Sequence, residues 1–325
     1  MVPFKMSSNR PLLLACLILG SLAGASMASQ DDTPAPSFQV AKPSPYLGQP
    51  IPGLSPERFA PGVVSTDAIE LNGVFAPDLR EFFFARLIDG VQTMYHSELV
   101  DGVWTVPRPL LLFPDKRRAV ADDMAVSPDG RELYFLGNHP AGVGQSDIWR
   151  SRRINGRWST AEVVPPPVST EASEVYPVIV GDGSLYFTSN RPGGVGPRSS
   201  LYRAQRREDG SFAAPVLVPA PINSEFGVGD TYVSPDESYL VFASGRPPSP
   251  GGGDLFVSFR RPDGGWSEPA HLGSTINTSQ VDFCPMVTPD GRFLFFSRRQ
   301  GASWSEATAG DVYWVDAKIL QQFRR

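Results

Sequence analysis

The chain has 325 residues with a formal net charge of −5 at neutral pH, and 41% of its residues are hydrophobic. This hydrophobic content excludes a disordered chain, and the acidic balance argues against nucleic acid or an anionic membrane surface as a partner. The 33 Pro and 31 Gly exceed average usage and indicate many tight turns, as in a domain of many short strands.

The first 28 residues have the pattern of a secretory signal peptide. Lys5 and Arg10 supply the positive charge, residues 11–27 are apolar or small, and Ala28 ends a stretch of small residues suited to cleavage. The strongly apolar run over residues 12–22 is too short to span a bilayer, so we expect no membrane span in the mature chain. We predict a signal peptide over residues 1–28, a linker over 29–44 and a β-propeller domain over 45–325.

Cysteine usage adds two expectations. The segment ending at Cys16 faintly resembles a lipoprotein processing site, but the apolar stretch before it is very short, so we do not expect lipidation. Cleavage of the signal would leave Cys284 alone, which allows no intrachain disulfide and suits a small buried packing residue.

An internal repeat predicts the architecture. Five segments align on a turn followed by an apolar strand, with turn aspartates spaced by 51, 53, 54 and 54 residues: Asp78, Asp129, Asp182, Asp236 and Asp290. Each unit is interpreted as four strands, named a to d in chain order. Strand a leads into the turn, strand b is apolar throughout, and strands c and d each carry an aromatic residue. The pattern predicts an all-β fold, a five-bladed β-propeller.

The fifth unit lacks a strand d, and the N-terminal segment offers a replacement. Residues 46–50 resemble the start of strand d at Trp104 and Trp266. We therefore expect an N-terminal strand to complete the last blade and close the ring, which would protect the sheet edges. A six-bladed ring is the alternative, if residues 29–72 contain further strands.

The repeats resemble the WD-like repeats of the TolB-type propeller family. The resemblance rests on the Ser-Pro-Asp-Gly turn at 127–130, on Ser-Asn-Arg-Pro-Gly-Gly at 189–194 and on the linker-like segment at 265–278, and it covers about residues 45–320. It implies a periplasmic propeller that acts through protein contacts. The chain departs from TolB because it has no separate N-terminal α/β domain, so only the character of a periplasmic scaffold is carried over.

Motifs for common chemistries are missing from the sequence. The three histidines, His96, His139 and His271, fall in different units without metal-ligand spacing, and there is no nucleophile elbow. The glycine-rich loops lack the residues of a phosphate cradle. We therefore expect no cofactor and no metal.

One set of residues is a candidate site. Each strand a begins with a carboxylate six or eight residues before the turn aspartate: Glu70, Asp123, Glu174, Asp230 and Asp282. Both offsets are even, so we expect all five side chains on one strand face, ringing a mouth of the central channel. Recurrence in every repeat favours a structural role. The alternatives are a site for a cation or basic peptide, or an acid and base for glycosidic hydrolysis. A second set after strand b is expected to pair with the turn aspartates: Arg86, Arg191, Arg246, Arg298 and Arg299.

The favoured hypothesis is a non-enzymatic periplasmic propeller, monomeric, that binds an envelope protein or a glycan on one face. A glycan-active hydrolase or lyase using the channel carboxylates is the alternative, by analogy of fold alone. A third hypothesis is an extracytoplasmic sensor domain that awaits partner subunits.

Overall fold

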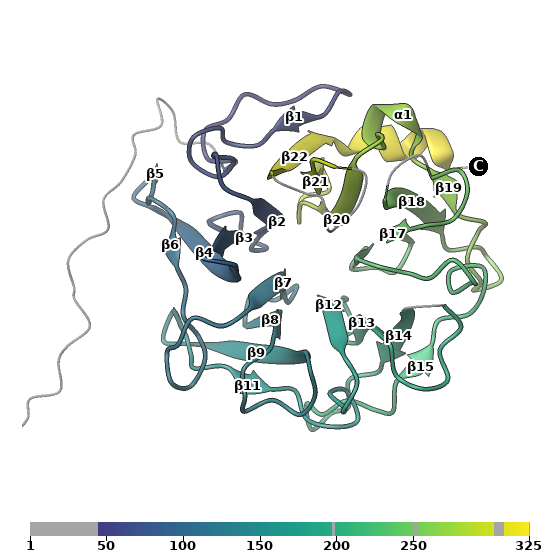
Figure 1. The fold of residues 1–325 in the computed structure, drawn as a ribbon, viewed down its shortest axis with the longest axis horizontal. Helices are drawn as coiled ribbons and strands as arrows, with labels where there is room; N and C mark the ends of the chain where they lie inside the picture. The colour runs from purple at the N-terminus through teal and green to yellow at the C-terminus, as the bar shows by residue number, and fades with distance from the viewer. Residues whose placement is uncertain (1–44, 197–198, 250–251, 302–308, 325) are drawn as a thin grey trace, which may run out of the picture. The chain divides into compact units, whose positions relative to one another are not determined.

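The computed structural model describes residues 45–324 apart from 197–198, 250–251 and 302–308, so the predicted signal peptide and linker lie outside the described residues. Five antiparallel sheets surround a central axis, each with its first strand innermost (Figure 1). The prediction of a five-bladed β-propeller is confirmed, and the six-bladed alternative is wrong. None of the described helices is long and apolar enough to cross a membrane.

The blades follow one another along the chain. Blade 1 contains β2 (Glu70–Phe75), β3 (Glu81–Ile88), β4 (Val91–Val100), β5 (Val103–Trp104) and β6 (Arg108–Pro109). Blade 2 contains β7 (Ala121–Val126), β8 (Glu132–Gly137), β9 (Asp147–Ile154), β10 (Arg157–Trp158) and β11 (Glu162–Val163). Blade 3 contains β12 (Glu174–Ile179), β13 (Leu185–Ser189), β14 (Ser200–Ala204) and β15 (Val216–Leu217). Blade 4 contains β16 (Thr231–Val233), β17 (Tyr239–Ser244), β18 (Asp254–Phe259) and β19 (Ala270–His271). Blade 5 contains β20 (Val281–Val287), β21 (Phe293–Arg299), β22 (Gly310–Asp316) and the N-terminal β1 (Glu57–Arg58). Two short helices, α1 (Gly273–Ile276) and the 3₁₀ helix η1 (Ala317–Phe323), follow β19 and β22.

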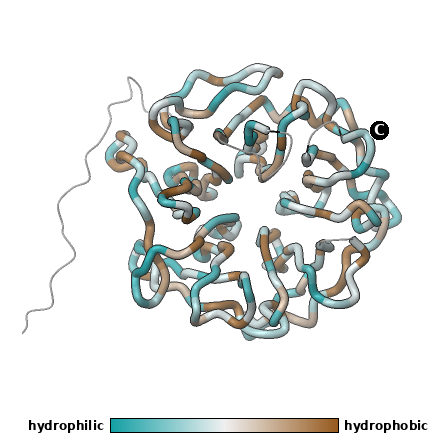
Figure 2. Tube along the Cα trace, viewed as in Figure 1, coloured by the Kyte–Doolittle hydropathy of each residue, from teal (hydrophilic) through white to brown (hydrophobic). Residues whose placement is uncertain are grey.

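The repeated turn between strands a and b has the predicted chemistry. In every blade the turn aspartate accepts a hydrogen bond from the backbone N–H two residues later, at 2.8 Å for Asp182 and 3.3 Å for Asp290. This local bond fixes the turn independently of the rest of the blade. The apolar strand that follows is then buried, as at Leu133–Phe135. Figure 2 shows hydrophobic residues concentrated in the strands and hydrophilic ones in the outer loops.

The outermost strand is broken into short pieces, whereas the sequence predicted a single strand d in each unit. Trp104 and Trp158 lie in two-residue strands, whereas Phe212 and Trp266 form only isolated bridges. The chain then pairs with strand c again at β6, β11, β15 and β19. In three blades a proline follows the aromatic by three residues, and proline lacks the N–H that a continuous ladder needs.

The N-terminal segment closes the ring, as predicted, but through a different stretch of chain. Glu57 and Arg58 pair with Trp314 and Tyr313 of β22. Residues 46–50 form a turn instead of a strand, with the Gln49 N–H donating to the Tyr46 carbonyl oxygen at 3.0 Å. The expected strand at residues 46–50 is therefore wrong, because its pairing position is taken by β1 farther along the chain.

Tyr46 nevertheless fills the aromatic position of the last blade. Its ring centroid lies 4.8 Å from that of Phe293 and 5.8 Å from that of Trp314, and its hydroxyl donates to the Asp290 carboxylate. Phe59 is fully buried beside Phe295 and Trp314 of blade 5 and Phe75 of blade 1. The first described residues thus connect the last blade to the first.

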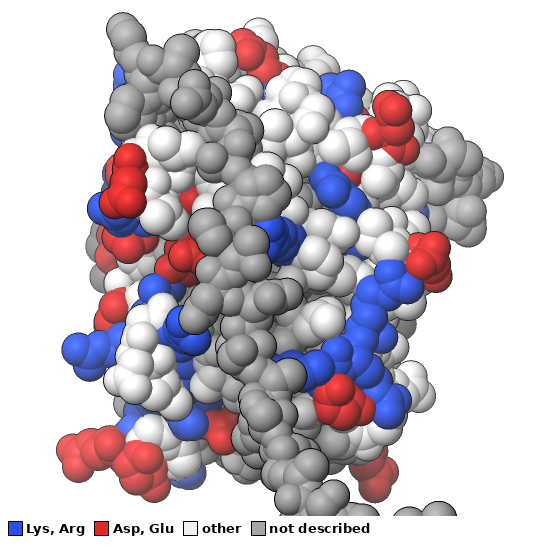
Figure 3. Space-filling model, turned by 90° about the vertical axis from the view of Figure 1, so that its left-hand side faces the viewer, with Lys and Arg blue, Asp and Glu red and all other residues white. Residues whose placement is uncertain are grey.

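Charged pairs add contacts between neighbouring blades. Arg153 of blade 2 pairs with Glu81 of blade 1, and the Arg206 guanidinium of blade 3 donates to the Glu132 carboxylate of blade 2 at 3.0 Å. In the side view of Figure 3, several basic side chains gather on the right-hand part of the face with acidic side chains beside them, and the other charged groups lie among uncharged ones.

Candidate functional site

A pocket of about 360 Å³ occupies the centre of the ring, and all five strands a contribute to its lining. Side chains near the start of these strands form its inner end, which we call the floor. Side chains between the floor and the turns form the walls, and prolines of the turns lie around the opening: Pro77, Pro128, Pro235 and Pro289. The pocket is therefore reached from the end of the propeller that carries the Pro-Asp turns.

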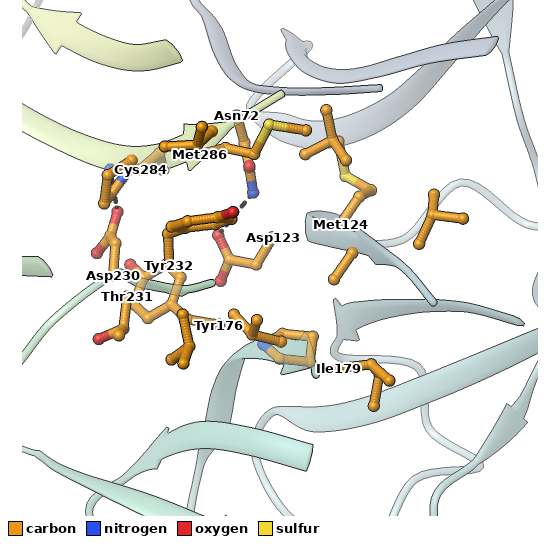
Figure 4. A pocket seen from close by; sticks show the side chains of 18 of the residues that line it. Asn72, Asp123, Met124, Tyr176, Ile179, Asp230, Thr231, Tyr232, Cys284 and Met286 are labelled. Carbon is orange, nitrogen blue, oxygen red and sulfur yellow. Dashed lines mark hydrogen bonds between the residues drawn. The ribbon is translucent and has the colours of Figure 1, made fainter. Parts of the chain in front are cut away.

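The floor is made by one residue from each blade, all at the same repeat position, six residues before the turn aspartate. These residues are Asn72, Asp123, Tyr176, Asp230 and Cys284, and Figure 4 shows them together around the pocket. The frame repeats but the side chains differ, so the floor has no fivefold symmetry. A site of this kind presents five different chemical groups to one ligand.

A β-bulge places these side chains. In four blades the pairing of strands a and b shifts register here, as between Leu71 and Val74 in β2. The bulged residue has a left-handed backbone, with φ between 48° and 57° in those blades. Asparagine and aspartate tolerate this conformation best, whereas Tyr176 and Cys284 adopt it with some strain.

The bulge also explains why the five predicted acids do not form one ring. Asp123 and Asp230, at offset six, both line the pocket, whereas Glu70, Glu174 and Asp282, at offset eight, do not. The even-offset argument assumes an uninterrupted strand, and the register shift breaks that alternation. Asn72, Tyr176 and Cys284 were missed for the same reason. Aligning the repeats strictly on the turn aspartate would have found them.

The three acids at offset eight are each held in a buried clasp. We define a clasp as the acid, a threonine four residues earlier and an arginine at the end of strand b or just after it. Glu174 accepts from the Thr170 backbone N–H at 2.9 Å and hydroxyl at 2.7 Å, and from the Arg191 guanidinium at 3.0 Å. The equivalent threonine and arginine partners are Thr66 and Arg86 for Glu70, and Thr278 and Arg298 for Asp282. A clasp joins the incoming loop to strands a and b.

The clasps correct the expected partners of the arginines. Arg86, Arg191 and Arg298 pair with the acids of strand a, not with the turn aspartates. In blade 4 the clasp position holds Val228, and Arg246 donates instead to the carbonyl oxygens of Pro221 and Ile222.

The floor contains carboxylates under strong electrostatic constraint. Asp123 is 5% exposed; its Oδ1 accepts from Asn72 Nδ2 at 3.3 Å, and its Oδ2 has no hydrogen-bond partner among the described residues. Asp230 Oδ2 accepts from the Cys284 backbone N–H at 2.8 Å. Burial, and then the charges of Asp122 and Asp230, raise the pKa of Asp123 well above its usual range. Burial likewise raises the pKa of Asp230.

Asp122 lies directly behind the floor, and its raised pKa leads us to expect that the stability of the protein depends on pH. Burial raises its pKa to about 6, although the Asp123 N–H donates to it at 2.7 Å. Between about pH 4 and about pH 6 folded Asp122 keeps its proton while the unfolded side chain has lost it, so stability falls as the pH rises. We expect a loss of about 2 kcal/mol across this window, measured by urea unfolding.

The Asp122→Asn variant is the control for this prediction. The amide cannot titrate, so its stability should change less than that of the wild type over the same pH window. Glu81 does not mask the effect, because its pKa is lowered to about 2 and its contribution is lost only at lower pH. Equal slopes for the two proteins would contradict the assignment to Asp122.

The walls above the floor are apolar. They include Val74, Val178 and Met286, and proline follows the floor residue directly in blades 3 and 5. Tyr232 and Thr231 add the main polar groups at this level. A ligand that fills the pocket would meet hydrophobic sides and a polar, acidic end.

The histidines lie outside the pocket, in separate blades. The imidazoles of His96, His139 and His271 lie 3.0, 3.2 and 3.4 Å from carboxylates of Glu81, Asp115 and Asp254. No group of three or more His, Cys, Asp or Glu within the described ranges could hold a metal ion.

Comparison with known proteins identifies the fold alone. No family model matches the chain, and no curated protein matches it. TolB from Acinetobacter baumannii is similar in structure, with a TM-score of 0.47 and 16% identity over 74% of this chain and 51% of that one. TolB from Agrobacterium tumefaciens has a TM-score of 0.49 and 15% identity, over 77% of this chain and 78% of that one.

An enzyme domain is similar to the same degree. The catalytic domain of a GH62 α-L-arabinofuranosidase from Coprinopsis cinerea has a TM-score of 0.49 and 11% identity, over 81% of this chain and 94% of that one. The chain spans about half the length of the Acinetobacter TolB. These likenesses concern the fold and do not distinguish binding from catalysis.

Proposed function

We propose that this chain is an exported, non-enzymatic β-propeller of the cell envelope that binds a segment of a partner protein in its central pocket. In this proposal residues 1–28 are a cleaved signal peptide, residues 29–44 are a linker, and the mature propeller is periplasmic. The N-terminal charge and apolar pattern described above support the export of the chain.

The observation that carries the proposal is the asymmetric pocket itself. A feature that only stabilises the repeat recurs with residues of the same kind, as the clasps do in three blades. The floor instead carries five different residues at one backbone position. Such divergence within a regular frame is expected where a single ligand contacts all the blades.

The walls favour a protein segment over a glycan. Ligand pockets typically combine apolar walls with a few polar groups that set orientation, and a volume of about 360 Å³ lies in their usual range. Val74, Val178 and Met286 offer dispersion contacts to aliphatic side chains but no hydrogen bonds to sugar hydroxyls. A peptide segment carries both the apolar groups and the polar backbone that this lining could accept.

A plug variant tests the proposal. Ala125 of β7 lines the pocket and is half-buried, so Ala125→Trp should fill the cavity without disturbing the strand. We would select peptides from a displayed random library on the wild-type protein and measure their binding by calorimetry. The selected peptides should bind Ala125→Trp at least about tenfold more weakly, a loss of about 1.4 kcal/mol.

The matched control is Ala141→Trp, which places the same side chain at an exposed position in the loop at the other end of blade 2. This variant should bind the peptides as the wild type does. Peptides that bind both variants equally would place recognition outside the pocket and contradict the proposal. Turnover of a glycan that is lost in Ala125→Trp would instead favour the hydrolase.

A further inference from the structure

Three buried carboxyl groups gather at or directly behind the pocket floor, and the protein places little positive charge beside them. Asp122, Asp123 and Asp230 are all buried and lie close enough for their charges to affect one another. Arg299 is the cation that acts on Asp122. Asp123 and Asp230 themselves have no ion pair with a lysine, arginine or histidine within the described residues.

The unpartnered oxygen of Asp123 points to a ligand independently of the acidic cluster. Buried carboxylate oxygens in folded proteins nearly always have a hydrogen-bond donor, because an unsatisfied one loses its hydration without compensation. Asp123 Oδ2 is buried and makes no hydrogen bond of normal geometry among the described residues, and Oδ1 has the Asn72 amide at 3.3 Å. The Tyr176 backbone N–H is the other donor that acts on this carboxyl group. A ligand that supplies a charged donor here would satisfy this oxygen.

The lining also indicates the shape of such a ligand. A charged donor must pass the apolar walls at Val178 and Met286 before it reaches the floor. Lysine and arginine combine an aliphatic stem with a cationic head, so the stem would contact the walls while the head meets the carboxylates. The pocket lining runs from Asp123 to Val126 in β7 and on to Pro128 in the turn, a span of up to roughly 15 Å for extended chain, so part of the partner backbone must enter as well.

A metal ion suits this floor less well than an organic cation. A calcium site needs six to eight oxygen ligands in a compact arrangement. The part of the chain that the structure describes holds no group of three or more His, Cys, Asp or Glu arranged to bind a metal. The apolar walls would also contribute nothing to an ion at the floor.

We propose that the floor of the central pocket, at Asp123 and Asp230, receives the cationic head of a lysine or arginine side chain from an extended segment of the partner protein. This inference rests on the proposed function, since it names the group of the partner that reaches the floor. Asp123 Oδ2 accepts from the cation, and the amide of Asn72 holds Asp123 Oδ1 in place.

Small probes test the inference without a known partner. Hexylammonium, hexylguanidinium and hexan-1-ol share an aliphatic stem and differ in the head group. Titration calorimetry of the folded propeller at neutral pH should show at least one cation binding about tenfold or more tighter than the alcohol. In Asp123→Asn the preference for the cation over the alcohol should fall at least about tenfold, since one of the two carboxyl groups at the floor is gone.

Two controls separate this result from general charge effects. Glu208→Gln removes one negative charge at an exposed position and should leave the preference for the cation unchanged. Ala125→Trp should abolish binding of all three probes. Calcium chloride alone should give no saturable heat, and saturable calcium binding lost in Asp123→Asn would overturn the inference in favour of a metal site.

The remaining outcomes distinguish the inference from the proposed function. Equal affinity for cation and alcohol, both lost in Ala125→Trp, would overturn the cation inference and leave the pocket as a binding site. Library peptides that need the open pocket but are not enriched in lysine or arginine would do the same. Peptides and probes that bind Ala125→Trp as well as they bind the wild type would contradict both the cation inference and the proposed function.

Discussion

An Arg191→Met variant is expected to unfold with a free energy about 3 kcal/mol below that of the wild type, measured by urea denaturation at neutral pH. Methionine keeps much of the aliphatic volume but removes the charge. Glu174 is completely buried and would then remain without its cationic partner, which is the costly case for a buried ion pair. The carbonyl oxygens of Pro167 and Val168 would lose their guanidinium donor as well.

Blade 4 contains a matched control for this prediction. Arg246 lies at the equivalent position and is also buried, but its hydrogen bonds go to carbonyl and hydroxyl oxygens, with no carboxylate partner among the described residues. Arg246→Met therefore leaves no buried charge behind and should cost less than Arg191→Met. The exposed Arg157→Met should change stability by less than about 0.5 kcal/mol.

A double variant separates the charge from the packing. Glu174→Gln combined with Arg191→Met removes both charges, so it should be more stable than Arg191→Met alone. If the free energy of unfolding of Arg191→Met lies within about 1 kcal/mol of the wild-type value, the ion pair of the clasp would behave as a solvated surface pair that does not stabilise the fold.

Phe59→Ala is expected to destabilise the propeller by about 4 kcal/mol, because it leaves a cavity where the last blade meets the first. Phe59 is fully buried, and its ring centroid lies 4.8 Å from that of Phe295, 5.1 Å from that of Trp314 and 5.1 Å from that of Phe82. The lost contacts are those that hold the N-terminal segment against β22, so the closure of the ring should weaken before the blades unfold.

Limited proteolysis provides the second measurement for this variant. Cleavage near residues 50–60 should be faster in Phe59→Ala than in the wild type, while the blades stay protected. Ile51→Ala is the control in the same segment, since Ile51 is 51% exposed and its truncation should be nearly neutral. Uniform acceleration of cleavage throughout the chain would contradict a local weakening of the closure.

The five blades were predictable because each turn and the strand after it depend on interactions between residues close in sequence. The turn aspartates accept hydrogen bonds from the backbone two residues later, and the strands after them are apolar throughout, which indicates burial on both faces. The repeat of this pattern alone predicts five blades. The closing strand was harder to place, since β1 has only two paired residues and no distinctive side chain. The aromatic pattern at Tyr46 correctly indicated that the N-terminal segment joins blade 5, but the strand that pairs there is β1 and not residues 46–50.

The candidate site was predicted only in part, for a geometric reason. Asp123 and Asp230 were expected at the channel and line the pocket. The bulge in strand a is invisible in the hydrophobic pattern, and it separates the two offsets that seemed equivalent. Whether the floor binds a ligand stays a prediction.

The pairing of β1 with β22 joins residues 57–58 to residues 313–314, almost the full length of the described chain. Loop closure over such a separation is slow, and it can occur only after the last sector has been synthesised. Until then Phe59 and Tyr46 lack their partners in blade 5, and the nascent chain carries an uncovered aromatic face at its leading end. The step most exposed to aggregation should therefore be the last one in assembly, when the two ends of the ring meet.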